Sequence, residues 1–213
     1  MKKRIVLRAG LLITMLVILR LLSIPALPEP PLETSRFVKV DPKGTEIEEN
    51  DGPWHCIKDN EQRLYWMVGR DDESPFDSYW TYSWYSSSLH IGEPHKGSCF
   101  YKTPGCNVSD IVAQANLQKV CGLSTWRLPT SQELLSLVQP PTKPEGPYIQ
   151  SGFFPHAHKG DYWSGDAAEA LTIKAFTHLN QGAVAVSFKD GTKRVLPYRN
   201  AAFVRLVANG KKT

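Results

Sequence analysis

The hydrophobic and polar positions of this chain change character along its length. Residues 9–27 are apolar, follow a basic start and contain Arg20 as their only charged residue. Prolines and then acidic residues come next, and from residue 53 onwards short apolar runs alternate with polar turns. These changes predict four parts: a leader over 1–27, a Pro-rich and acidic linker over 28–52, one folded domain over 53–208 and a tail over 209–213.

The leader has the form of an export signal. Residues 9–27 make up 19 positions, which is enough to span a bilayer as an N-terminal hydrophobic helix. The residues around Ala26 form a poor cleavage site, so a cleaved signal peptide and an uncleaved signal anchor both remain open. In either case we expect an exported domain. It is either anchored on the periplasmic side of the inner membrane through the N-terminal segment or secreted to the cell surface.

The net charge of +4 comes from the leader, because residues 1–32 carry five basic side chains and one acidic one, and residues 33–213 sum to zero. A neutral folded part gives no support to nucleic-acid binding. The charges are nonetheless polarised, with −6 over residues 33–80 and +6 over residues 81–213. The two halves either attract each other or present an acidic and a basic face.

Within the domain, the patterns predict an α+β fold with a small antiparallel sheet, two helices and long ordered loops. The first helix begins at the cap Ser109 and ends at Gly122. The second begins at Ser131, because Thr130 and Glu133 stand in the capping-box relation T-x-x-E. Strands are predicted at 36–40 as an edge strand, and at 54–57, 64–69, 162–164, 183–188, 192–197 and 203–207, with 171–176 as a strand or a loop.

The four cysteines are an even set in an exported chain, which favours disulfides. Three pairings are open to them. Pro104-Gly105 predicts a tight turn that brings Cys99 and Cys106 together, which leaves Cys56 to pair with Cys121. A zinc site is the alternative, although no C-x-x-C pair occurs.

A series of short motifs resembles one known family. It opens with Trp54-His55-Cys56-Ile57 and Leu64-Tyr65-Trp66, which are similar to W-x-C-V and L-x-W. It continues in chain order with Tyr82-Ser83-Trp84-Tyr85, Val120-Cys121-Gly122, Trp126-Arg127-Leu128-Pro129-Thr130, Phe153-Phe154-Pro155, Tyr162-Trp163-Ser164 and Val204-Arg205-Leu206-Val207. The series resembles the Lcl C-terminal domain family over roughly residues 53–208.

The resemblance implies a secreted or surface-exposed bacterial protein with a C-type-lectin-like fold. In the collagen-like adhesin that names the family, the domain is associated with binding sulphated polysaccharides and with adhesion. Collagen repeats are absent from this sequence, so trimerisation does not carry over. Calcium-dependent sugar binding is not expected, because Glu93-Pro94-His95 lacks the amide of an E-P-N loop and no W-N-D occurs.

Two groups of residues are candidates for ligand binding. Tyr79 and Trp80 lie in the irregular stretch 70–98 and are expected to be exposed for stacking on a sugar ring. A basic group is expected to receive sulphates or carboxylates: Lys189, Lys193, Arg194 and Arg199, with Lys159 and Lys174 as further members. A third group is interpreted as structural: Trp126, Arg127, Leu128, Pro129, Thr130, Glu133 and Trp163.

These residues favour a binding protein over an enzyme. No nucleophile–base motif or phosphate loop of known spacing occurs, and we expect no cofactor. His156 and His158 with Asp161 have the residue types of a zinc site, but a loop H-x-H is a weak signal and we expect no metal. The first hypothesis is an envelope binding module for an acidic glycan or an envelope protein. The alternative is an accessory structural subunit of an envelope assembly such as a pilus or secretion apparatus.

Overall fold

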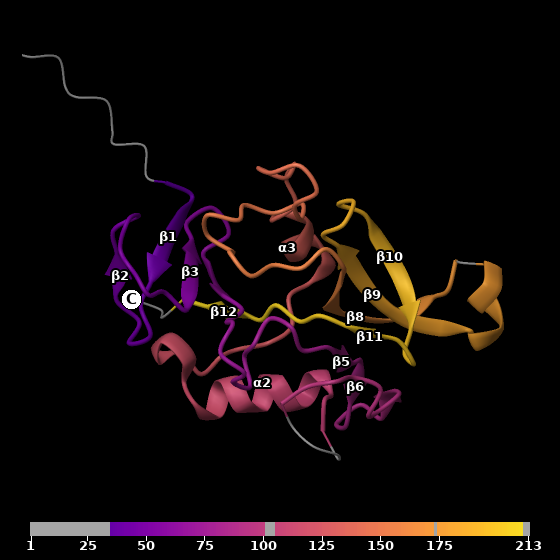
Figure 1. Cartoon of the computed structure of the whole chain (residues 1–213). Helices are drawn as coiled ribbons and strands as arrows, with labels where there is room; N and C mark the ends of the chain where they lie inside the picture. The colour runs from indigo at the N-terminus through magenta and orange to yellow at the C-terminus, as the bar shows by residue number, and fades with distance from the viewer. Residues whose placement is uncertain (1–34, 101–104, 173, 211–213) are drawn as a thin grey trace, which may run out of the picture. The chain divides into compact units, whose positions relative to one another are not determined.

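The computed structural model describes residues 35–100, 105–172 and 174–210 (Figure 1). The predicted leader lies outside the described residues. The compact unit to which they belong begins at Ser35. Within the described ranges, no helix has both the length and the apolar character needed to cross a membrane.

A five-stranded antiparallel sheet organises the N-terminal half of the domain. The strand predicted at 36–40 is internal to this sheet rather than at its edge, and the outermost strand on that side follows it in the chain. Both strands fall within the predicted linker, so this part of the linker is folded sheet. The strands are β1 (Phe37–Val40), β2 (Glu46–Ile47), β3 (Cys56–Asp59), β4 (Leu64–Met67) and β12 (Val207–Asn209), in the order β12-β4-β3-β1-β2.

The hairpin between β3 and β4 depends on a buried carboxylate. The first strand begins two residues later than predicted and includes Asp59, whose side chain is fully buried. This carboxylate accepts hydrogen bonds from the backbone N–H groups of Glu61 and Gln62, each at 3.1 Å. It also pairs with the guanidinium of Arg36 at 2.9 Å, which joins the turn to the start of β1. A buried charge is tolerated because it is both paired and hydrogen-bonded.

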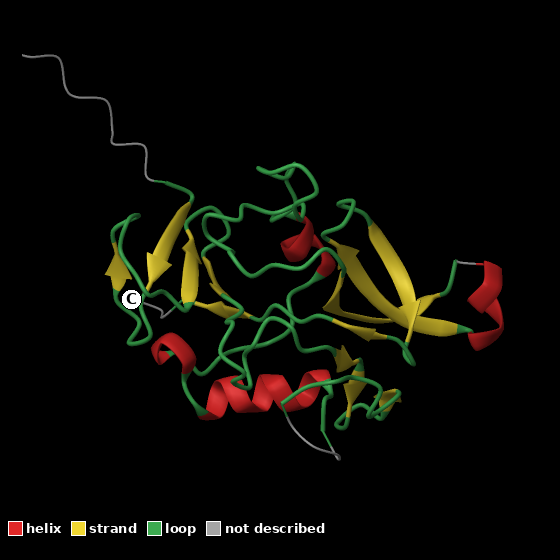
Figure 2. Ribbon diagram, viewed as in Figure 1, coloured by secondary structure: helices red, strands yellow, loops and turns green. Residues whose placement is uncertain are grey.

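The C-terminal half contains a second, three-stranded antiparallel sheet, so the single sheet that we predicted is wrong. Its order is β10-β9-β8, and β8 runs well beyond the predicted 162–164, with register shifts along it. The stretch 171–176 enters a 3₁₀ helix, η2 (Lys174–Leu179), instead of a strand. Two further two-stranded ribbons complete the set, and loops make the connections (Figure 2). The strands are β8 (Asp161–Ala170), β9 (Gln181–Ser187), β10 (Lys193–Pro197), β5 (Tyr82–Ser83) paired with β11 (Ala201–Ala202), and β6 (Tyr85–Ser86) paired with β7 (Ile91–Gly92).

The described residues contain two α-helices, α2 (Val108–Leu117) and α3 (Ser131–Leu135). The cap of α2 is Asn107 rather than Ser109, and the Asp110 carboxylate accepts hydrogen bonds from the Asn107 backbone and side-chain N–H groups at 2.9 Å. The helix ends before Gly122, because Lys119 turns into the left-handed region with φ of 48°. Leu117, the last residue of α2, is 78% exposed.

The segment W-R-L-P-T connects the two helices. Arg127 forms a bidentate ion pair with Glu133, with both N–O distances at 2.8 Å. Glu133 also accepts a hydrogen bond from the Thr130 backbone N–H at 2.7 Å, while the Thr130 hydroxyl accepts one from the Glu133 backbone N–H at 3.1 Å. This is the capping box that the sequence predicted. The buried indole of Trp126 donates to the Val120 carbonyl at 3.2 Å, which fixes the segment behind α2.

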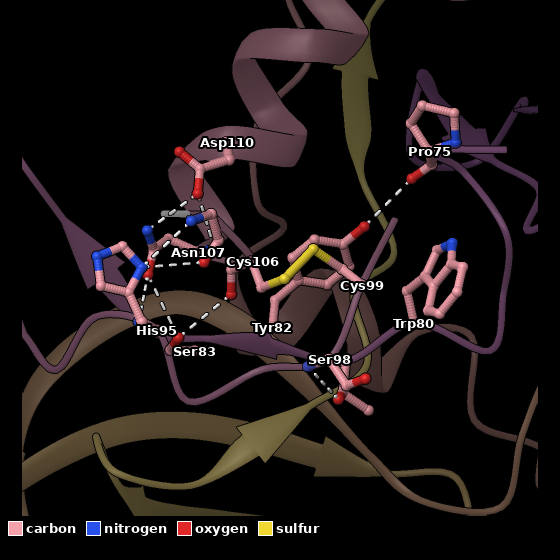
Figure 3. Close-up of a disulfide and its surroundings, with 12 residues drawn as sticks. Pro75, Trp80, Tyr82, Ser83, His95, Ser98, Cys99, Cys106, Asn107 and Asp110 are labelled. Carbon is pink, nitrogen blue, oxygen red and sulfur yellow. Dashed lines mark hydrogen bonds between the residues drawn. A yellow bond between two sulfur atoms is a disulfide. The ribbon is translucent and has the colours of Figure 1, made fainter. Parts of the chain in front are cut away.

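Two disulfides cross-link the domain in the predicted pairing. Cys56–Cys121 joins β3 to the short turn η1 (Val120–Gly122) across a sequence separation of 65. Cys99–Cys106 closes a separation of 7 just before α2, and Figure 3 shows it beside Tyr82. The described residues contain no free cysteine.

The two disulfides should differ in their contributions to stability. Because the chain-entropy model scales with loop length, replacing Cys56 and Cys121 by alanine should lower the free energy of unfolding by about 4 kcal/mol, against about 2 kcal/mol for Cys99 and Cys106. Urea denaturation of both double variants beside the unmodified protein measures the difference. A larger loss for the Cys99–Cys106 variant would contradict the prediction.

Candidate functional site

A surface hollow brings together residues from five separate segments of the chain. Its volume is about 720 Å³, which lies within the range of about 300–1,000 Å³ that is usual for small-ligand sites. Four of the lining residues, Tyr79, Trp80, His158 and Phe203, have aromatic rings, so we call it the aromatic hollow. Its lining includes Tyr79, Trp80, Thr81, Ser98, Pro147, His158, Lys159 and Phe203.

The loop before β5 presents Tyr79 and Trp80 to this hollow. The Asp77 carboxylate shapes the loop by accepting hydrogen bonds from the backbone N–H groups of Asp72, Glu73 and Tyr79 at 2.8–3.0 Å. With its backbone held in this way, Tyr79 projects outward and is 74% exposed. Trp80 is half-buried, and its indole N–H donates to the Ser74 carbonyl at 2.9 Å. The exposure predicted for this pair is therefore found in full only for Tyr79.

A neighbouring segment forms the opposite rim. Thr81 and Ser98 form an isolated antiparallel bridge, in which the Thr81 backbone N–H donates to the Ser98 carbonyl at 2.9 Å. The Thr81 hydroxyl accepts a hydrogen bond from the Ser98 backbone N–H at 3.2 Å. Figure 3 shows Ser98 and the adjacent Cys99 next to Trp80, with the disulfide running to Cys106. The shorter disulfide therefore anchors one wall of the aromatic hollow to the start of α2.

His158 lies at the centre of the aromatic array. Its ring stacks on Phe203 with centroids 4.9 Å apart and an interplanar angle of 12°. Tyr79 approaches it edge-on at 5.6 Å, and the Ser78 hydroxyl lies 3.3 Å from its Nε2 atom. Its backbone N–H donates to the Tyr162 hydroxyl at 2.9 Å, which ties the loop to β8. Burial lowers the pKa of His158 below its ordinary value of 6.5, so the ring is neutral at pH 7.

A buried cation lies under this array. Arg205 is 5% exposed, and its guanidinium carbon lies 4.5 Å from the centroid of Phe154 and 5.5 Å from that of Tyr162. One terminal nitrogen donates to the Met67 carbonyl at 3.3 Å. Burial lowers the pKa of Arg205. Cation–π contacts of this kind stabilise a desolvated guanidinium, so Arg205 supports the site from inside rather than contacting a ligand.

Lys159 supplies the positive charge of the aromatic hollow. Its ammonium lies 3.0 Å from the Glu145 carboxylate, which belongs to the long loop between α3 and β8. The hydrogen bond from Lys159 lowers the pKa of Glu145. Pro147, two residues further along the same loop, lines the hollow directly. The hollow therefore combines aromatic faces with one cation that already has a carboxylate partner.

The structure separates the predicted basic group from the predicted aromatic pair. Arg194 on β10 pairs with Asp190 at 2.7 Å and with Asp161 at 3.5 Å. Hydrogen bonds from Thr192 and from Arg194 lower the pKa of Asp190 to about 2. The Arg194 charge is therefore matched within its own hairpin.

The other basic candidates are exposed. Lys189, Lys193 and Lys174 all lie on the surface, and the Arg199 guanidinium lies over the Phe176 ring at 5.6 Å. Lys159 is the member that lines the aromatic hollow with Tyr79 and Trp80. The hairpin meets the residue after this lysine through the backbone, where the Phe188 N–H donates to the Gly160 carbonyl at 2.9 Å.

Sequence reasoning missed Phe203 and considered His158 only as a metal ligand. Both are brought to the hollow by long-range packing, so no local motif marks them. His158 and Asp161, which have the residue types of a zinc site in the sequence, have other partners, since His158 is stacked on Phe203 and Asp161 pairs with Arg194. Across the parts of the chain that the structure describes, no three His, Cys, Asp or Glu side chains are placed to hold a metal ion.

The two tryptophans interpreted as structural, Trp126 and Trp163, are in the core, as are Trp66 and Trp84. All four are at most 4% exposed, so they are not available to stack on a ligand. Trp54 is half-buried, with the Lys39 ammonium 3.6 Å above its ring.

Fold and site together define a disulfide-linked α+β domain with an aromatic surface hollow and no described metal cluster. The model of the Lcl C-terminal domain family matches residues 55–208, and the chain belongs to this family. The match confirms the resemblance seen in the motifs. No curated protein and no solved structure matches the chain.

The lowered pKa of His158 predicts a pH-dependent contribution to stability. A histidine whose pKa falls on folding binds fewer protons in the native state. Its contribution is therefore complete above the unfolded value of 6.5 and is lost as the pH falls through the native value. His158→Phe should give a shallower fall in Tm between about pH 7 and pH 5 than the unmodified protein shows.

The control is Leu89→Ala, which removes an exposed side chain that does not titrate and should leave the pH profile of Tm unchanged. A residual slope is expected in the His158 variant, because burial also lowers the pKa of His55. Equal slopes for the His158 variant and the unmodified protein would show that burial of this ring does not influence its titration.

Proposed function

We propose that the domain is an exported binding module that recognises an acidic glycan in the aromatic hollow without calcium. The observation that carries the proposal is that the hollow places an exposed tyrosine and a half-buried tryptophan beside a lysine. Ligand sites combine apolar and aromatic walls with a few well-placed polar groups. The C–H faces of a sugar ring pack on Tyr79 and Phe203, and Lys159 pairs with a sulphate or carboxylate on the same sugar.

Hydroxyl groups on the rim add to this recognition. Thr81 and Ser98 both line the hollow and carry side chains that donate and accept hydrogen bonds. Sugars are recognised through such groups when no cation bridges to their hydroxyls.

The proposal includes the compartment and the fold that the family resemblance implies. Two disulfides are consistent with an exported protein, because such bonds form and persist in oxidising compartments. A C-type-lectin-like fold and a location in the cell envelope belong to the proposal in the same way. The partner is then a polysaccharide at the cell surface or in the surroundings of the cell.

Binding of dextran sulphate and of unsulphated dextran of equal length tests the proposal. The protein should bind the sulphated oligosaccharide, with an affinity that falls as salt rises and does not change with EDTA. Tyr79→Ala should weaken binding about tenfold, because it removes the exposed aromatic face. Lys159→Ala should weaken binding of dextran sulphate more than binding of dextran.

Two control variants separate the hollow from the rest of the surface. Leu89→Ala removes another exposed apolar side chain, 64% exposed, and should leave the affinity unchanged. The double variant Lys189→Ala, Lys193→Ala removes the exposed lysines of the basic hairpin. A larger loss in this variant than in Lys159→Ala would move the site to the hairpin. Failure to bind any acidic glycan would reject the proposal in favour of the accessory subunit, with an envelope protein as partner.

A further inference from the structure

Lys159 already pairs with a carboxylate of its own chain. The Lys159 Nζ atom lies 3.0 Å from Glu145 Oε2, and the two residues are 14 positions apart. This contact occupies the cation that the proposed function assigns to an acidic ligand. We infer that Glu145 acts as an internal competitor for the acidic group of the ligand and thereby sets the charge selectivity of the aromatic hollow. The inference rests on the proposed function.

Backbone geometry holds Glu145 in this position. Its φ of 63° lies in the left-handed region, which non-glycine residues adopt only when the surroundings require it. A tight turn surrounds it, in which the Gly146 N–H donates to the Lys143 carbonyl at 2.9 Å. The loop is then fastened to β9, because the Tyr148 N–H donates to the Phe188 carbonyl at 2.7 Å. An unfavourable backbone conformation is therefore used to place a carboxylate at the rim of the hollow.

The exposure of the pair makes Glu145 easy to displace. Its side chain is 93% exposed and that of Lys159 is 35% exposed. Ion pairs this open to solvent contribute little to stability, so a ligand with several acidic groups or a better geometry replaces Glu145 at small cost. A neutral sugar has no group that competes for the ammonium. A weakly acidic sugar is disfavoured, because two carboxylates beside one ammonium repel each other.

Removing the Glu145 charge should therefore strengthen the binding of acidic sugars alone. For the full-length protein, Glu145→Gln should raise the affinity for dextran sulphate about two- to fivefold, the range expected for loss of one exposed ion-pair competitor. The affinity for unsulphated dextran should stay the same. In the background of Lys159→Ala, the effect of Glu145→Gln should disappear, because the contested cation is gone.

The matched control is Glu46→Gln, which removes one negative charge from another exposed lysine pair, with Lys58 at 2.6 Å on the five-stranded sheet. It should leave both affinities unchanged. An equal rise in this control would assign the effect to net charge and would overturn the inference. A rise from Glu145→Gln that persists without Lys159 would also overturn it, as would an unchanged or lower affinity.

The same titrations distinguish failure of this inference from failure of the proposed function. If the unmodified protein binds dextran sulphate and Lys159→Ala weakens that binding, the proposed function holds. If Glu145→Gln then leaves the affinity for dextran sulphate unchanged, only the role of Glu145 is overturned. If neither the unmodified protein nor Glu145→Gln binds any acidic oligosaccharide, both proposals are wrong.

Discussion

Two buried indole N–H groups hold the aromatic segment 82–84 against β8, and the candidate site depends on this contact. Trp163 donates to the Tyr82 carbonyl at 2.7 Å, and Trp84 donates to the Ser164 carbonyl at 2.8 Å. The two segments are about 80 residues apart in the sequence. Each segment donates one indole N–H to a backbone carbonyl of the other. Separating the segments would leave two indole N–H groups and two carbonyls buried without partners. Each such group would lower the free energy of unfolding by roughly 1–3 kcal/mol. The contact therefore fixes Trp80 and Thr81, just before the segment, beside the loop that carries His158.

The lining of the aromatic hollow is made of loops, but those loops have little freedom. Asp77 organises the turn that presents Tyr79, and the Cys99–Cys106 disulfide anchors the wall that contains Ser98. The Tyr162 hydroxyl accepts the backbone N–H of His158. Such restraints lower the entropy that a ligand must otherwise remove on binding. A site of this kind suits recognition of a flexible polysaccharide, because the protein side is already ordered.

Charge is balanced locally in this domain. The ion pairs among the described residues join partners within one half of the chain, as Arg36–Asp59 does in the acidic half and Arg194–Asp190 does in the basic half. The difference in net charge between residues 33–80 and 81–213 is therefore not neutralised by the salt bridges of the described residues, which join no residue of one half to the other. It remains as a difference in charge between the two parts of the chain, and the aromatic hollow takes residues from both of them.

Local chemistry in the sequence determined several features correctly. The Thr130–Glu133 capping box and the β3–β4 hairpin depend on residues a few positions apart. Their patterns can therefore be recognised in the sequence without knowledge of the fold. The disulfide pairing followed from a tight turn and from elimination. The exposure of Tyr79 was predicted because an irregular segment cannot bury every aromatic side chain that it contains.

Tertiary structure decided the rest. Asn107 replaces Ser109 as the helix cap because its side-chain oxygen also accepts a hydrogen bond from the His95 backbone N–H, 12 residues away. β1 became an internal strand because β2, from the predicted linker, pairs with its free side. The aromatic hollow unites positions near 80, 98, 158 and 203. No local pattern encodes such a site, because its members meet only when loops that are distant in the sequence pack together in the folded domain.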